Sequence, residues 1–249
     1  MRKLWTLSVC FTLLFLFGFL PGKAFAQGEL IRNGSFETGD FHAWDTINEF
    51  DGSGDWFIYS GTSTPINSFT VLPPPDGVFA AITDQTGGGT HLLIQDIFIP
   101  QGATVTCSAV IYYENRAEDF FTPDDLFSSN GPNQQARVDI LSKNANLFTV
   151  SDGVLLNVFQ TLPGDPLSRG YTTLNFDLSE FAGSSVRFRV AEVDNQFFFN
   201  FAIDEVSCIA EGGIPASIPT LGEWGLIAMA GALGLAGLVF ARRRRLRAV

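Results

Sequence analysis

The chain has 249 residues, of which 26 are acidic, 15 are basic and only two are histidine. Glu223 is the only acidic residue outside 27–217, whereas eight of the basic residues lie outside it, so this segment carries a net charge of about −18. Such an acidic segment excludes nucleic acid as an expected partner. Its length is enough for one domain with a sizeable core.

The N-terminus has the features of a secretory signal peptide. Two basic residues precede an apolar run over 4–20, and Ala24 and Ala26 then form a small-x-small cleavage site. We predict that residues 1–26 are this signal peptide and that the secretion translocon exports the rest. An uncleaved anchor is the alternative, because the apolar run is near the upper length for a signal peptide.

The segment 27–210 is predicted to be one all-β domain. Apolar and polar residues alternate with period two, as in Val105–Ile111, which is typical of half-buried antiparallel strands. The other expected strands are 55–59, 78–83, 91–99, 137–140, 172–178, 186–190 and 198–207. Turns rich in Gly, Pro and Asp separate them, and no sustained helical stripe is present. This pattern predicts a β-sandwich of the jelly-roll type.

Two long connections, 61–76 and 114–135, interrupt the strands, and such loops often carry binding residues. The second contains Asp124 and Asp125, which we interpret as a solvated acidic loop with cation binding as the lesser alternative.

Exposed aromatic side chains that could stack on sugars are the other candidate binding residues. Trp44 is assigned to the core, and parity places Trp56 and Tyr59 on opposite faces of one strand, so only one of those two can belong to an exposed platform.

Two cysteines, Cys107 and Cys208, remain after removal of the signal peptide. Export favours a disulfide between them, and a closed loop of about 100 residues stabilises by up to ~4.7 kcal/mol in the entropic treatment. The alternative is a buried free thiol, because Cys107 falls on the apolar face of its strand. No Cys-x-x-Cys pair is present, which excludes zinc ribbons and thioredoxin-like chemistry.

Sharp catalytic motifs are absent from the sequence. His42 and His91 are the only histidines, no Gly-x-Ser-x-Gly elbow accompanies them, and they cannot form a His-Glu-x-x-His metal motif. We therefore predict a protein that is not an enzyme. The alternative is a pair of catalytic carboxylates for glycan hydrolysis, because the many acidic residues offer many such pairs.

The C-terminus is predicted to cross a membrane. After a small, flexible linker over 211–217, residues 218–249 hold a short motif, an apolar run over 224–241 and a basic tail over 242–249. About 20 apolar residues span a bilayer, and the arginines place the C-terminus in the cytoplasm. The motif consists of Ile218, Pro219, Thr220, Leu221, Gly222, Glu223 and Trp224, and the tail begins with Arg242, Arg243, Arg244 and Arg245.

This arrangement resembles the IPTL-CTERM protein-sorting signal of Gram-negative bacteria. The resemblance implies that a membrane-embedded sorting protease of the exosortase type recognises the motif, with Pro219 and Thr220 as recognition residues. The helix is then a transient anchor. A permanent anchor is the alternative that the same hydropathy permits.

A second resemblance lies at the two ends of the domain. Residues 30–41 with Trp44 look like the opening strand of galactose-binding-like jelly rolls and of many carbohydrate-binding modules, and 202–207 look like their closing strand. In such folds the two strands are neighbours, so the resemblance implies that Glu37 and Asp204 hold a structural calcium. The alternative is that these carboxylates face solvent or pair with Arg32.

Together these observations predict an exported, non-catalytic β-sandwich used for adhesion, matrix or cell-surface association. It would pass through an intermediate anchored in the inner membrane before reaching the cell surface or the medium. A carbohydrate-binding module that binds extracellular polysaccharide is the second hypothesis, and a carboxylate-dependent glycan hydrolase is the third.

Overall fold

The computed structural model of the protein describes residues 28–213 and 231–233. The chain divides into two compact units, and the first unit ends at Gly213. In the second unit the described residues form a single helical turn. Among the described residues no helix is long and apolar enough to cross a membrane.

Several predicted segments fall outside these ranges. The signal peptide over 1–26, the sorting motif over 218–224 and the basic tail over 242–249 all lie outside the described residues. Of the predicted membrane helix over 224–241, only the turn at 231–233 is described. The structure therefore does not test these four assignments.

Eleven strands and one short 3₁₀ helix make up the described part of the first unit. In chain order they are β1 (Gly28–Glu29), β2 (Asp45–Asn48), β3 (Asp55–Tyr59), β4 (Ala80–Asp84), β5 (Gly89–Phe98), β6 (Ala103–Asn115), β7 (Gln134–Ser142), β8 (Val154–Gln160), β9 (Ser168–Asp177), η1 (Ser179–Phe181), β10 (Ser185–Asp194) and β11 (Phe199–Gly212).

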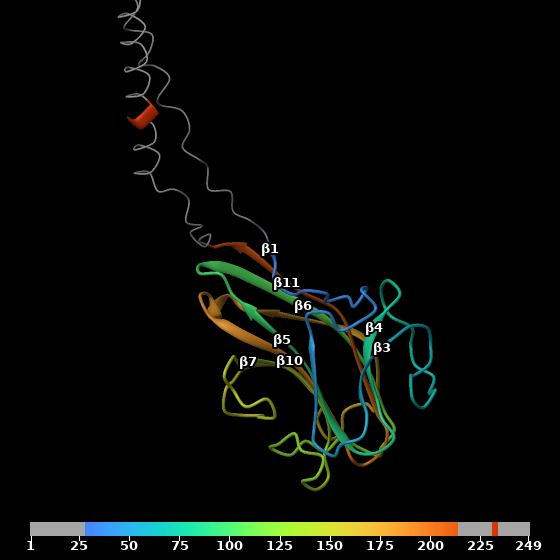
Figure 1. Cartoon of the computed structure of the whole chain (residues 1–249). Coiled ribbons are helices and arrows are strands. Elements are labelled where there is room, and N and C mark those ends of the chain that lie inside the picture. Colours follow the sequence, from blue (N-terminus) through green and yellow to red (C-terminus); the bar gives the residue numbers. More distant parts are fainter. Residues whose placement is uncertain (1–27, 214–230, 234–249) are drawn as a thin grey trace, which may run out of the picture. The chain divides into compact units, whose positions relative to one another are not determined.

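The strands form two antiparallel sheets that pack face to face, as Figure 1 shows. One sheet has the order β3-β4-β11-β6-β9, with β1 added beside β11, and the other has the order β2-β5-β10-β7-β8. From β4 to β11 every connection except β7 to β8 crosses between the sheets. The predicted all-β sandwich is confirmed.

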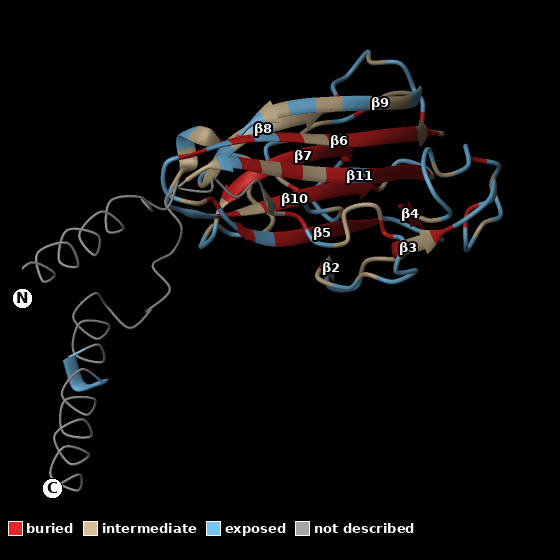
Figure 2. Cartoon of the chain, turned by 90° about the horizontal axis from the view of Figure 1, so that it is seen from above, coloured by how far each residue is buried: buried red, intermediate tan, exposed pale blue. Residues whose placement is uncertain are grey.

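Period-two alternation places one face of each strand in the core between the sheets. The inward residues of β6, β10 and β11 are buried, as the red bands of Figure 2 show. Trp44 packs there with its ring centroid 5.5 Å from Phe36 and 5.9 Å from Phe188. Its predicted place in the core is confirmed.

A β-bulge in β11 shifts the register between Asp204 and Ser207. Phe201 and Ile203 face the core before the bulge, and Cys208 faces it afterwards. The extra residue thus reverses which positions point inward. Glu205 lies within the bulge with a left-handed φ of 49°, which few non-glycine residues adopt.

The opening segment differs from the expected strand. Only Gly28–Glu29 is extended, and 30–44 forms turns and bends with left-handed φ angles at Asn33 and Phe36. Strands β2 and β8 were not expected, because β2 has only four residues and β8 lacks strict alternation of apolar and polar residues. Strand β11 also continues to Gly212, two residues into the predicted linker.

The outer face of the sheet around β10 is covered by a loop over 143–153. Leu147, Phe148 and Val150 of this loop pack on the apolar side chains of β5 and β10. Arg189 of β10 is buried below the loop and donates hydrogen bonds to the carbonyl oxygens of Leu147 and Thr149, at 2.5 and 2.7 Å. A buried guanidinium therefore holds the loop against the sheet.

Candidate functional site

The opening segment lies against the bulge of β11, and we call this contact the seam. Strand β1 pairs with the end of β11, and the backbone N–H of Val206 donates to the carbonyl of Gly34 at 3.0 Å. A Cβ at Gly34 would collide with the carbonyl oxygen of Val206. Glycine is therefore required at the point where the two backbones meet. The predicted proximity of the two ends of the domain is confirmed.

Asp204 is buried at the seam with half of its carboxylate unpaired. One oxygen accepts the N–H of Glu205 at 2.8 Å, whereas Oδ2 has no partner among the described residues. Burial, together with the charges of Glu205, Glu37 and Asp76, outweighs the hydrogen bond from the backbone of Glu205 and raises the pKa of Asp204 to about 7. Four acidic groups thus share one electrostatic environment.

Glu37 holds the opening segment to the connection before β4. Its Oε1 accepts the backbone N–H groups of Val78 and Phe79 at 2.9 and 2.8 Å. The expected alternative, an ion pair with Arg32, does not form within 28–213. The backbone N–H of Arg32 donates instead to Gln95.

An open groove of about 630 Å³ lies beside the seam. Its wall includes the acidic residues Glu29, Asp76 and Glu205, together with Asn33 and Gly34. Hard divalent cations bind carboxylate and carbonyl oxygens. Neither Glu37 nor Asp204 lines this groove, and a structural calcium at the seam stays a prediction.

The two cysteines face each other across β6 and β11. Cys107 and Cys208 are direct cross-strand partners with their Cα atoms 4.1 Å apart, and a disulfide joins them. Both residues are buried in the main core. The bridge thus links β11, just after its bulge, to the strand beside it.

The expected tryptophan and tyrosine platforms are not exposed. Trp56 and Tyr59 are on opposite faces of β3, as parity predicts, but only 2% and 3% of their surfaces are exposed. Tyr112 and Tyr113 are also buried, and Tyr171 is half-buried with its hydroxyl 2.7 Å from that of Tyr59. The four buried rings cannot stack on a sugar from solution.

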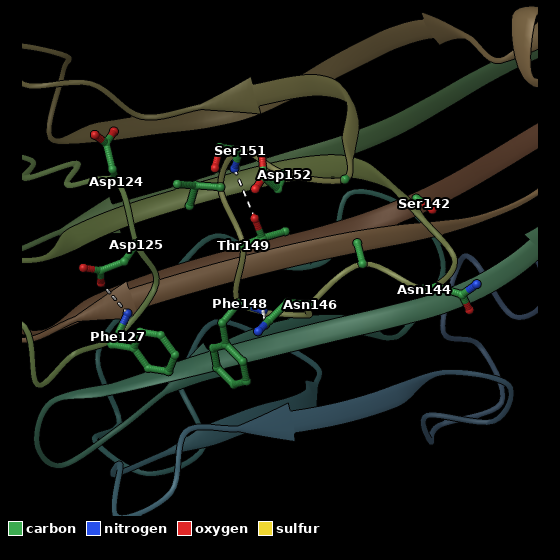
Figure 3. A pocket seen from close by; sticks show the side chains of 13 residues that line it. Asp124, Asp125, Phe127, Ser142, Asn144, Asn146, Phe148, Thr149, Ser151 and Asp152 are labelled. Atoms are coloured by element: carbon green, nitrogen blue, oxygen red, sulfur yellow. Dashed lines mark hydrogen bonds between the residues drawn. The ribbon is translucent and has the colours of Figure 1, made fainter.

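A second open groove of about 610 Å³ lies between the loop over 143–153 and the acidic loop before β7, and Figure 3 shows its lining. Phe127 and Phe148 stack there with ring centroids 5.2 Å apart and an interplanar angle of 15°. Ala145, Val150 and Gly153 also line the groove, and the rest of its lining is polar: Asp124, Asp125, Ser142, Asn144, Asn146, Thr149, Ser151 and Asp152.

Sequence reasoning found one wall of this groove and missed the other. Asp124 and Asp125 were expected in a solvated loop, and they lie on the groove wall. The loop over 143–153 was not singled out, although its run of Asn, Ser, Thr and Asp residues between two strands is a turn signal. The sequence does not mark Phe148 as a groove residue, because a single phenylalanine in a loop forms no periodic pattern.

The C-terminal residues 216–245 match the IPTL-CTERM motif, a range that contains the predicted motif over 218–224, the apolar run over 224–241 and Arg242–Arg245. The predicted resemblance is confirmed for this segment. A sorting motif of this kind implies processing by sorting machinery and an exported, surface-associated protein. No curated protein matches the chain in sequence.

Three solved structures illustrate the likeness of the sandwich to other proteins. TmCBM61 in complex with beta-1,4-galactotriose is 11% identical over 73% of this chain and 97% of its own, with a TM-score of 0.43. The K3 cleaved adhesin domain of Lys-gingipain from Porphyromonas gingivalis is 14% identical over 74% and 98%, with a TM-score of 0.42.

The third is a Stig cyclase from Fischerella sp. TAU, which is 15% identical over 76% of this chain and 100% of its own, with a TM-score of 0.42. Because each TM-score is below 0.5, these likenesses do not decide what this chain binds or does.

Proposed function

We propose that this chain is an exported, surface-sorted jelly-roll protein with a non-catalytic role in adhesion, matrix or cell-surface association. The match of 216–245 to a sorting motif carries the proposal. The strand orders β4-β11-β6-β9 and β5-β10-β7-β8, with crossings between the sheets, support the jelly-roll interpretation. The net charge of about −18 over 27–217 keeps such a domain soluble outside the cell.

The proposed route begins with a signal peptide over 1–26 and the secretion translocon. The apolar run over 224–241 then holds an intermediate in the inner membrane, with the tail from Arg242 to Arg245 in the cytoplasm. An exosortase-type protease would bind the motif around Pro219, whose ring favours an extended backbone in Ile218. Cleavage releases the domain to the cell surface.

A structural calcium at the seam would serve this role by stabilising the domain outside the cell. Asp204 and Glu37 would supply carboxylate oxygens, and an ion there would neutralise a group of acids that otherwise raise the pKa of Asp204. The unpaired, buried Oδ2 of Asp204 supports this assignment. The ion would fasten the opening segment to β11.

Carbohydrate binding is the second candidate function, and the groove with the Phe127–Phe148 pair favours it. Stacked apolar rings beside carboxylates and amides offer both an apolar surface and hydrogen-bonding groups, as small-molecule sites require. An extracellular polysaccharide would be the ligand. A glycan array probed with the full chain tests this, and Phe127→Ala should reduce any affinity found by about tenfold or more.

Phe50→Ala is the matched control, because Phe50 is 90% exposed and does not line the groove. Unchanged sugar binding in Phe127→Ala would show that the sugar binds outside this groove. Turnover assays on polysaccharides, repeated with single carboxylate-to-amide variants, separate binding from the third possibility, a glycan hydrolase.

The sorting proposal is tested by protease treatment of intact spheroplasts. We expect residues 27–217 to be digested, because the domain lies outside the inner membrane before release. A variant in which Arg242–Arg245 are replaced by glutamine should weaken this orientation, since positive charge retains the tail in the cytoplasm. Complete protection of 27–217 in the wild-type chain would contradict the proposal.

A further inference from the structure

A second group of titratable side chains lies inside the sandwich. Glu192 of β10 is directly opposite His91 of β5, and Asp194 is opposite Gly89. Parity places these side chains on the face of β10 that carries the core residue Val190. His91 and Glu192 are fully buried, Asp194 is 2% exposed, and one ligand atom of each lies within 4.8 Å of the others.

The imidazole of His91 is oriented as a metal ligand. Its Nδ1 lies 2.9 Å from the amide oxygen of Asn48, which can only accept, so Nδ1 carries the proton and Nε2 a lone pair. Nε2 has no hydrogen-bond partner of normal geometry among the described residues, and the backbone of Ser53 is the polar group beside it. Metal-binding histidines are typically held by such a bond from the other ring nitrogen.

The two carboxylates lack a positively charged partner, and Glu192 lacks hydrogen bonds as well. Neither oxygen of Glu192 has a hydrogen-bond partner in the described part of the chain, and no ion pair reaches either acid there. Asp194 accepts from the side chain of Gln85 at 2.6 Å and from the N–H of Gly89 at 3.1 Å. An isolated buried carboxylate is costly unless it is neutralised and bonded.

Protonation of the two carboxylates would remove their charge but would not supply the missing hydrogen bonds of Glu192. Burial, with the charge of Asp194, raises the pKa of Glu192, and burial raises that of Asp194 to about 8. A protonated Glu192 would still have an O–H group without an acceptor among the described residues. A bound cation would interact with both oxygens of Glu192 and with the Nε2 lone pair of His91.

The backbone also keeps space at this point. A Cβ on Gly89 would lie 2.9 Å from Nε2 of His91 and 2.6 Å from the carbonyl oxygen of Ser53, so any side chain there would crowd the group. Asp194 also lines a cavity of about 270 Å³ with Gly87 and Gly88. His91 and Glu192 do not line it.

We propose that His91, Glu192 and Asp194 form a binding site for a divalent d-block cation, with zinc as the test ion. One imidazole nitrogen and two carboxylate oxygens are a zinc-type ligand set, whereas calcium and magnesium prefer oxygen alone. Metal bonds of about 2.1 Å would draw the three atoms slightly together. The ion would join β5 and β10 and, through Gln85, the end of β4.

The test measures zinc in the purified full chain. After chelator treatment, loading with zinc and dialysis, the wild type should retain one zinc per chain by elemental analysis. X-ray absorption should find one imidazole among the zinc ligands. Glu192→Gln should raise the zinc Kd at least 100-fold, because it removes a charged ligand and keeps the shape of the side chain.

Two matched controls locate the site. His42 is exposed and is the only other histidine, so His42→Gln should retain both the zinc and its imidazole signal, whereas His91→Gln should lose them. Asp204→Asn removes an acid of the seam and should leave zinc binding unchanged. If Glu192→Gln does not fold, the number of zinc ions per wild-type chain and the zinc content of the two histidine variants still test the proposal.

The proposal is overturned if the wild type retains no zinc, which would indicate a hydrated polar cavity. Calcium retention without zinc retention would also overturn it, as would a folded Glu192→Gln that binds zinc as tightly as the wild type. Loss of the imidazole signal in His42→Gln would assign the metal to the surface and would equally contradict it.

Discussion

Asp139 of β7 is fully buried between two guanidinium groups, and it allows a sharp test of what stabilises the sandwich. It accepts hydrogen bonds from Arg137 at 2.7 and 2.9 Å, from Arg189 at 2.6 Å and from Asn157 at 2.8 Å. Arg189 in turn holds the loop over 143–153. One carboxylate therefore compensates two buried positive charges.

Asp139→Asn keeps the shape of the side chain and removes this compensation. Breaking a buried ion pair by removing one partner costs about 3–5 kcal/mol, so the urea midpoint should fall by about 1–2 M. The matched control is Asp96→Asn, because Asp96 pairs with Arg187 at 2.7 Å and its side chain is 38% exposed. That pair should contribute about 1 kcal/mol or less.

The same variant makes a pH prediction. Burial raises the pKa of Asp139, but hydrogen bonds from Arg137 and the charges of Arg189 and Arg137 outweigh it, and the pKa is below its usual value of 3.8. The stabilisation is therefore complete above the unfolded-state value and is lost as pH falls through the folded-state value. The difference between wild type and Asp139→Asn should narrow in acid below about pH 3.8.

Urea unfolding of the wild type and both variants, followed by circular dichroism at several pH values, measures these differences. An Asp139→Asn variant that is no less stable than Asp96→Asn would refute the reasoning. So would a difference in unfolding free energy that stays constant into strong acid.

Three further predictions concern the seam, the thiols and the tail. The melting temperature of the full chain should rise with free calcium and fall with chelator, and Glu37→Gln should remove most of this dependence; a wild-type curve insensitive to both would exclude the ion. Alkylation of the unreduced, denatured mature protein should label neither Cys107 nor Cys208, and two labelled thiols in the mass spectrum would mean that no bridge forms. Pro219→Ala combined with Thr220→Ala should make the unprocessed chain accumulate in the native host on an immunoblot, and normal processing would remove these residues from the recognition site.

The sandwich was readable from sequence because half-buried strands leave a period-two pattern. The prediction for β3 coincides with its observed bounds, and those for β5, β9 and β11 overlap the observed strands. Strand β8 was not predicted, because its apolar and polar residues do not alternate strictly and most of them are only partly buried. The opening motif resembled a strand, but Asn33 and Phe36 adopt left-handed backbone angles that no periodicity reveals.

The sites were less readable, because sequence distance hides spatial neighbours. Glu37 and Asp204 could be paired only through a resemblance, and His91 is 101 residues from Glu192. Sequence reasoning excluded a His-Glu-x-x-His motif and did not consider a site in which one histidine joins acids far away in the chain. The register of β5 against β10, which brings His91 opposite Glu192, follows from the fold and not from any local pattern.

The most direct test of the central proposal is the location and intact mass of the protein in its native host. The proposal predicts a chain at the cell surface or in the medium that begins at Gln27 and lacks Arg242–Arg245. A 249-residue chain in the cytosol would contradict both export and sorting. A chain held in the membrane that retains Arg242–Arg245 would contradict processing and leave the anchor permanent.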